Sequence, residues 1–201
     1  MFALIFGLSF LANAQDVQKD QPKGYQFTDI KRLPATSVKD QARAGTCWSW
    51  SGISFFESEM IRMGKEPIDL SAMYIVRHAY GDKAEKFVRL HGNMNFAVGG
   101  AFCDVMHVIK NYGIVPMEVY MGLNYGEPNH AFGEIDDVLA GYINAVIKNS
   151  NKKLSTAWKA GFNGILDAYL GAEPEKFEYK GKEYTPRTFA DEVVGLNMDD
   201  Y

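Results

Sequence analysis

The stretch of sequence that decides the fold is VKDQARAGTCWSWS, residues 38–51. Gly45 permits a tight turn, after which Cys47 is expected to open a helix. A thiol there faces unpaired amides and the positive end of the helix, which favour the thiolate. The amide of Gln41 can return across the loop and donate a hydrogen bond beside that thiol. Together they would form a nucleophile with an oxyanion hole, and the alternative is a buried, inert cysteine beside a loop glutamine.

The composition is that of an ordinary globular protein. The chain has 201 residues, of which 47% are hydrophobic and 23% charged, and its formal net charge is −4. The apolar content argues against disorder, and the lack of a basic surplus argues against nucleic acid as a partner. Two cysteines exclude a disulfide-rich scaffold, and the four histidines show no metal-ligand spacing. We therefore expect one domain or slightly more, with no metal and no cofactor.

Hydrophobic periodicity predicts a mainly helical chain after residue 46. The first helix is expected from Cys47 to about Met63, and a second begins after Asp69-Leu70-Ser71 and continues through Val76 and His78. Residues 82–98 fit no single pattern. The remaining elements expected are helices at 101–112, 134–148 and about 155–170, a small hairpin over 177–184, and a helix capped by Thr185 with Pro186 in its first position.

The N-terminus has the pattern of a removable signal peptide over residues 1–14. Residues 1–11 are apolar and uncharged, and residues 12–14, Ala-Asn-Ala, match the small-residue pattern before a cleavage site. The apolar run is shorter than the roughly 20 residues that span a bilayer, so the mature form should not be membrane-bound. A buried N-terminal helix is the alternative. We expect residues 15–35 to be a flexible lead-in and the protein to be exported to the periplasm, the outer surface or the medium.

Residues 41–51 resemble the nucleophile signature of papain-like cysteine peptidases, Gln-x-x-x-Gly-x-Cys-Trp-[Ser/Ala]-[Phe/Trp]-Ser. Two more blocks follow in the family's order. Residues 69–71 are similar to the start of its second helix, and Gly99-Gly100 with residues 112–116 are similar to its substrate segment and the exit from the next helix. The likeness covers about residues 36–120. It implies an α+β papain-like fold, of which this chain is mostly the α-helical half without the β-rich half.

The resemblance implies roles for five residues. Cys47 is the implied nucleophile, and Gln41 with the backbone N–H of Cys47 is the implied oxyanion hole. Gly99 and Gly100 are the implied strip that pairs with an extended peptide substrate, because absent side chains allow a close approach. A simple turn is the alternative for these glycines. Trp48 is assigned to the same substrate-binding region.

Two departures from papain itself indicate a subgroup. The neighbourhoods of papain's disulfide hold Ala44 and Ala97-Val98 here, and the stretch before Gln41 is too short for a long inhibitory propeptide. These features resemble the bleomycin hydrolase and bacterial aminopeptidase C subgroup, although its familiar members are intracellular. The expected activity is therefore that of an aminopeptidase acting through a Cys47 acyl-enzyme, and the resemblance alone leaves a homo-oligomer open.

A thiol peptidase also needs a general base, and no histidine of this chain fits that role well. The resemblance implies a His and an Asn in a β-rich half, far downstream of the nucleophile. His130 has a superficially similar neighbourhood but comes too early and lacks the expected flanks. We therefore expect residues 36–201 to be the N-terminal part of a longer peptidase domain, with the catalytic His and Asn beyond residue 201. The isolated 201-residue polypeptide should be inactive.

Two other functions stay open at this point. A peptide-binding pseudopeptidase would keep the groove but lack a base. A thiol redox protein would use Cys47 and Cys103, although the chain has no C-x-x-C pair. We expect Cys103 to be a packed residue, with a Cys47–Cys103 disulfide as the alternative.

Overall fold

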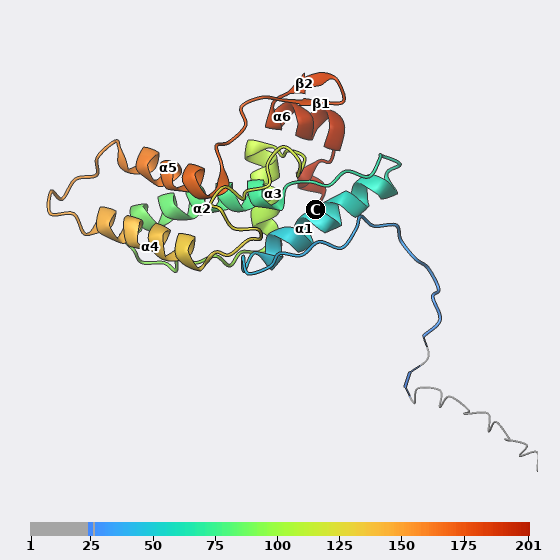
Figure 1. The fold of residues 1–201 in the computed structure, drawn as a ribbon, viewed down its shortest axis with the longest axis horizontal. Helices are drawn as coiled ribbons and strands as arrows, with labels where there is room; N and C mark the ends of the chain where they lie inside the picture. Colours follow the sequence, from blue (N-terminus) through green and yellow to red (C-terminus); the bar gives the residue numbers. More distant parts are fainter. Residues whose placement is uncertain (1–23, 26) are drawn as a thin grey trace, which may run out of the picture. The chain divides into compact units, whose positions relative to one another are not determined.

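Six α-helices carry most of the chain between residues 47 and 189 (Figure 1). The structure, a computed structural model, describes residues 24–25 and 27–201, so the predicted signal peptide lies outside the described residues. Residues 33–201 form one compact unit, separate from the preceding residues. The elements in chain order are α1 (Cys47–Arg62), α2 (Ala72–Arg89), α3 (Phe102–Tyr112), α4 (Gly133–Ile147), α5 (Trp158–Leu170), β1 (Phe177–Tyr179), β2 (Lys182–Tyr184), α6 (Pro186–Phe189), a π-helical turn (Ala190–Val194) and a 3-10 turn (Met198–Asp200).

Most of the predicted elements are confirmed to within a few residues. The antiparallel hairpin pairs β1 with β2, placing Phe177 opposite Tyr184. Thr185 caps α6 with its side chain, and Pro186 follows in the first position. Among the helices of the described residues, none is both long and apolar enough to cross a membrane.

The sequence left residues 82–98 without an assignment, and the structure shows that α2 continues into this stretch as far as Arg89. Charged residues between positions 82 and 86 obscure the apolar pattern there. The helix nevertheless keeps a buried stripe at the helical spacing of three and four residues, formed by Tyr80, Ala84, Phe87 and Val88.

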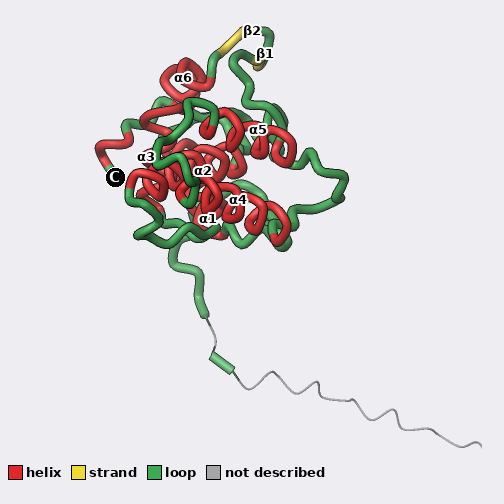
Figure 2. The backbone as a smooth tube through the Cα atoms, turned by 90° about the vertical axis from the view of Figure 1, so that its left-hand side faces the viewer, coloured by secondary structure: helices red, strands yellow, loops and turns green. Residues whose placement is uncertain are grey.

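Helix α2 is the centre of the hydrophobic core. Eleven of its 18 residues are buried, which requires neighbours on nearly every side. It packs against α1, α3, α4 and α5, and it lies among these helices in Figure 2. Its start is fixed by Ser71, whose Oγ accepts from Tyr74 N at 3.0 Å and donates to Tyr120 O at 2.6 Å.

The Glu57 carboxylate of α1 joins three segments of the chain. Its side chain is fully buried and accepts hydrogen bonds from Thr36 Oγ1, from Lys39 Nζ at 2.9 Å and from Leu70 N at 2.7 Å. Lys39 Nζ also lies 2.8 Å from Asp69 Oδ1. Although burial opposes it, hydrogen bonding to Asp69 and Glu57 raises the pKa of Lys39, so the ammonium stays charged. The approach to Cys47 and the start of α2 are thereby fixed to α1.

Replacing this buried carboxylate should destabilise the protein far more than replacing an exposed one. Glu57→Gln leaves the Lys39 ammonium with one fewer charged partner, and we expect a loss of about 3 kcal/mol in the free energy of unfolding. Glu59→Gln is the matched control on the same helix, because its ion pair with Arg62 is at the surface, where solvent screens it, and its loss should cost far less stability. Urea unfolding of both variants measures the difference, and equal losses would contradict this role for Glu57.

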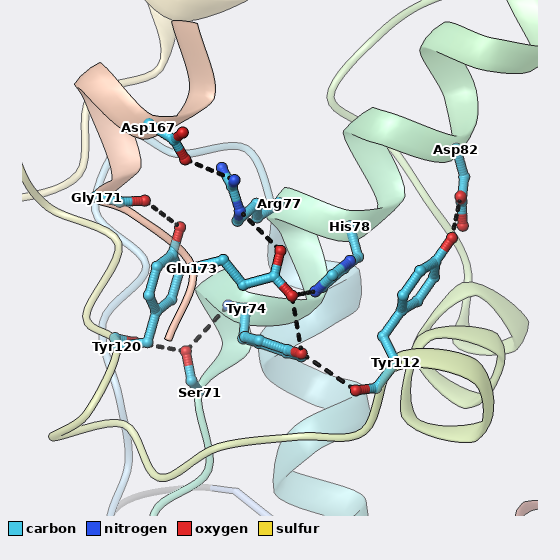
Figure 3. A network of polar contacts seen from close by, with 10 residues as sticks. All are labelled: Ser71, Tyr74, Arg77, His78, Asp82, Tyr112, Tyr120, Asp167, Gly171 and Glu173. Atoms are coloured by element: carbon cyan, nitrogen blue, oxygen red, sulfur yellow. Dashed lines mark hydrogen bonds and ion pairs between the residues drawn. The ribbon is translucent and has the colours of Figure 1, made fainter. Parts of the chain in front are cut away.

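A second polar network connects α2 to α5 and to the loop after it (Figure 3). Arg77 Nη2 lies 2.6 Å from Asp167 Oδ1, and Arg77 Nε lies 3.7 Å from Glu173 Oε2. Glu173 Oε1 lies 3.1 Å from His78 Nε2 and accepts from Tyr74 Oη at 3.4 Å. Contact with His78, assisted by Arg77, lowers the pKa of Glu173 despite its partial burial.

This network should stabilise the fold only while Glu173 is ionised. Its pKa is lower in the folded than in the unfolded chain, so its contribution is present above about pH 4.5 and lost as the pH falls through the folded value. Because the side chain is 40% exposed, screening limits this contribution to about 1 kcal/mol. We expect Glu173→Gln to lose stability at pH 7 and to show a flatter decline below pH 5 in urea titrations. Glu175→Gln, an exposed neighbour, should follow the wild type at every pH.

Candidate active site

Cys47 is the first residue of α1, and its thiol is free and exposed. The preceding residue, Thr46, makes no side-chain capping bond, and the first turn of α1 contains no acidic residue. Across residues 27–201 no hydrogen bond is found for the N–H of Cys47. The positive end of α1 is therefore not neutralised by another side chain, which leaves it available to an anion at the thiol.

The loop before α1 contains the predicted oxyanion-hole residue, Gln41. Ala44 N donates to Gln41 O at 3.2 Å, which closes a turn between this glutamine and the helix. Gly45 then takes a left-handed φ of 67°, and a Cβ at that position would lie 3.2 Å from Val98 Cγ1. The side-chain Oε1 of Gln41 is buried without a hydrogen-bond partner in the described part of the chain. The role of Gln41 as an oxyanion donor stays a prediction.

Trp48 joins the start of α1 to the predicted substrate strip. Its indole is buried, and Nε1 donates to Val98 O at 3.0 Å. Gly100 lies directly against the ring, because a Cβ added there would be 2.5 Å from Trp48 Cε2. A Cβ added at Gly99 would meet nothing within 4 Å. The structure therefore brings Trp48 and Gly100 together, and only Gly100 is required to be glycine by packing.

The backbone of Gly100 is free to pair with another chain. Of the residues described, none forms a hydrogen bond with its N–H or its C=O. The next amide, Ala101 N, is already bonded to Asp104 Oδ2 at 2.8 Å. The unpaired backbone groups at Gly100 are of the kind that an extended peptide can bind.

His130 lies beside the loop before α1 but makes no bond to Cys47. Its carbonyl accepts from Arg43 N at 2.9 Å, and its ring centroid lies 6.0 Å from that of Trp50. Burial lowers the pKa of His130, so its imidazole is neutral at pH 7. Its ring lines a cavity of about 340 Å³ that also borders Asp40 and Trp50, a feature with no signal in the sequence.

The other three histidines do not contribute to a site with Cys47 in the described structure. In the described structure the thiol of Cys47 forms no side-chain hydrogen bond with any of them. The three are His78 in the network of Glu173, His107 with its Nε2 3.3 Å from Asp82 Oδ2, and His91 at the exposed end of α2. Nor do His, Cys, Asp and Glu gather in groups of three or more that could hold a metal, as far as the described residues extend.

The expectation that Cys103 is packed was wrong. Its thiol is exposed and free, in the first turn of α3. The side chain of Asp104 caps this turn through Ala101 N, so an acidic group already occupies the positive end of α3. Both cysteines are thus exposed near the start of a helix. The first turn of α1, which contains Cys47, has no acidic residue, whereas the first turn of α3, which contains Cys103, has Asp104.

A family model described as papain family cysteine protease matches residues 22–160. The chain belongs to this family. Among curated proteins it is similar to aminopeptidase C of Lactococcus lactis subsp. lactis (strain IL1403), with 24% identity over 214 residues that cover 86% of this chain and 46% of the relative. It is also similar to the cathepsin B-like CP2 of Giardia intestinalis, with 28% identity over 92 residues that cover 41% and 31%.

A crystal structure of PepW from Lactobacillus rhamnosis HN001 has the same fold, with a TM-score of 0.59 and 22% identity over 84% of this chain and 46% of that chain. The predicted papain-like fold and the resemblance to the aminopeptidase C subgroup are therefore confirmed. This papain-family chain is mostly helical and spans about half the length of the curated aminopeptidase C and of PepW.

The two glycines of the strip should respond differently to a methyl group. Gly100→Ala forces the Trp48 indole to move, and we expect it to cost about 1–3 kcal/mol in the free energy of unfolding and to change the near-UV circular dichroism of the tryptophans. Gly99→Ala is the matched control and should cost less than about 0.5 kcal/mol. Identical spectra and stabilities for the two variants would show that the indole does not pack on Gly100.

Proposed function

We propose that this papain-family chain provides the nucleophile and the substrate-binding strip of a cysteine peptidase. One observation carries the proposal. Cys47 is exposed at the uncapped start of α1, and the next residue, Trp48, packs against the free backbone of Gly100. The residue that carries the thiol therefore directly precedes the residue that packs on an unpaired backbone segment, and acyl transfer from a peptide requires a nucleophile close to the bound chain.

In the proposed reaction the Cys47 thiolate attacks the carbonyl carbon of the scissile peptide bond. The N–H of Cys47 and the side-chain amide of Gln41 donate to the oxyanion that forms. A histidine gives its proton to the departing amine, which leaves the acyl group on the sulfur. Water then attacks this thioester, returns a proton to the histidine and releases the acid.

We propose that this histidine, and the Asn that orients it, come from outside residues 1–201. His78, His107 and His130 each contact other groups, His91 is exposed beyond the end of α2, and none of the four bonds to Cys47 in the described part of the chain. The polypeptide 1–201 alone should accordingly show no peptidase turnover. Turnover by purified 1–201 would contradict this assignment.

We also propose that the substrates are peptides cleaved from a free N-terminus. The support is the likeness to a protein named aminopeptidase C over 86% of this chain. A longer protein containing residues 1–201 should cleave a peptide with a free amino group and leave the N-acetylated form intact. Equal cleavage of both peptides would indicate an endopeptidase instead.

Cys47 should react with alkylating agents faster than Cys103, although both thiols are exposed. The start of α1 has no acidic residue, whereas Asp104 lies beside Cys103 and caps the start of α3, so only at Cys47 is the positive helix end left open beside the thiol. We expect the iodoacetamide rate, followed by peptide mass spectrometry at pH 7, to be about tenfold higher at Cys47.

Substitution of each cysteine provides the control for this assignment. Cys47→Ala should abolish peptidase turnover in the longer protein, and Cys103→Ser should leave it unchanged. Faster labelling of Cys103, or loss of turnover in Cys103→Ser, would favour a thiol redox function over the peptidase.

A pseudopeptidase that binds peptides without cleaving them is the second candidate. It is favoured by the lack of any histidine bonded to Cys47 among the described residues. In that case a longer protein would bind a peptide equally well with Cys47→Ala and would never release a product.

Export after removal of residues 1–14 is a separate proposal that rests on the sequence pattern alone. N-terminal sequencing of the protein purified from its source tests it, and Gln15 is the expected first residue.

A further inference from the structure

Three consecutive carbonyl groups, those of Ala97, Val98 and Gly99, lead into the proposed substrate strip and accept hydrogen bonds from two side chains. Trp48 Nε1 donates to Val98 O at 3.0 Å. The ammonium of Lys83 donates to Ala97 O at 3.3 Å and to Gly99 O. The Gly99 carbonyl is therefore fixed, and it lies immediately before Gly100, whose own N–H and C=O are unpaired among the described residues.

Lys83 is well placed to hold these carbonyls. It extends from α2 with its ammonium 5.4 Å from the centroid of the Trp48 ring, at the distance of a cation–π contact. Burial lowers the pKa of Lys83, while Asp104 and Asp136 oppose that effect and Lys86 adds to it. The two acidic groups favour the ammonium form of Lys83, which is the form that donates to the carbonyls of residues 97–99.

The direction of the Gly100 N–H follows from the geometry of one peptide unit. The C=O of Gly99 and the N–H of Gly100 belong to the same peptide plane, and cis peptide bonds are absent from the described chain. In a trans peptide these two groups point in opposite directions. A Gly99 carbonyl that faces Lys83 therefore turns the Gly100 N–H away from α2.

We propose that Lys83 is a positioning residue, which fixes the Gly99 carbonyl so that the Gly100 N–H is presented to the backbone of a bound peptide. This inference rests on the proposed peptidase function and adds a residue to it. Without the Lys83 ammonium, the peptide unit 99–100 can rotate, since neither glycine restricts its own backbone. Peptide binding would then have to fix this unit each time, at the cost of its conformational freedom.

Two thiol reagents separate peptide positioning from thiol reactivity in the longer protein that contains this chain. A peptidyl chloromethyl ketone needs the strip to reach Cys47, whereas iodoacetamide is too small to use it. The readout is the ratio of the two alkylation rates at Cys47. We expect Lys83→Met, which keeps a long unbranched side chain but removes the ammonium, to lower this ratio about tenfold through loss of the charged hydrogen bonds.

Two further variants distinguish positioning from a general disturbance. Lys83→Arg keeps a charged donor and should restore the ratio to within about threefold of the wild type. Lys86→Met, on the same helix but exposed, should leave the ratio unchanged. An unchanged ratio in Lys83→Met, or an equal fall of both rates, would overturn the role of Lys83. A wild-type protein that shows no preference for the peptidyl reagent would instead overturn the proposed peptidase function itself.

Discussion

The buried carboxylate of Glu57 is the constraint on which the rest of the arrangement depends. A charge with no exposed surface must be satisfied by hydrogen bonds from the protein, and here they come from Thr36, Lys39 and Leu70. Thr36 and Lys39 precede α1, and Leu70 precedes α2. One carboxylate therefore fixes both the segment that approaches Cys47 and the point at which α2 begins. The loop between Lys39 and α1 is then held at both ends. Gly45, with its left-handed φ, allows the chain to turn into α1 within this loop.

The same two helices hold the segment that leads into the proposed substrate strip, Gly99-Gly100. Trp48 comes from the first turn of α1 and Lys83 from the middle of α2, and both donate to carbonyls of residues 97–99. Their relative position is fixed by the contact of α1 with α2, to which the bond from Leu70 N to Glu57 contributes. The stability of the helical core and the orientation of the strip are therefore consequences of one packing arrangement. The position of the Cys47 thiol depends on the same packing, because Cys47 directly precedes the tryptophan that packs on Gly100.

Local patterns in the sequence predicted the features that depend only on residues close together in the chain, such as most of the helices and their ends. The apolar spacing of α3 and the glycine that ends it, Gly113 with φ of 89°, are properties of one segment. The partners of Glu57 lie 13, 18 and 21 residues away in the sequence and those of Glu173 more than 90, so no local pattern indicates them. Lys83 was missed for the same reason, since its effect on the strip exists only after α2 has packed beside Trp48. Cys103 was misjudged because the sequence does not show which side of α3 faces the core.

The chemistry of the proposed site divides into two parts with different physical demands. Orienting a peptide and stabilising an oxyanion need fixed donors, and the backbone of Gly100 and the N–H of Cys47 belong to elements already held by α1 and α2. Proton transfer needs a group that can change its charge beside the sulfur. His130 packs near Trp50, with its pKa lowered by burial, and His78 stacks on Tyr112 of α3 and faces Glu173 in the loop after α5. In the proposed reaction the described residues would supply the fixed donors but not the group that transfers the proton, so recognition of a peptide and its hydrolysis would be physically separable.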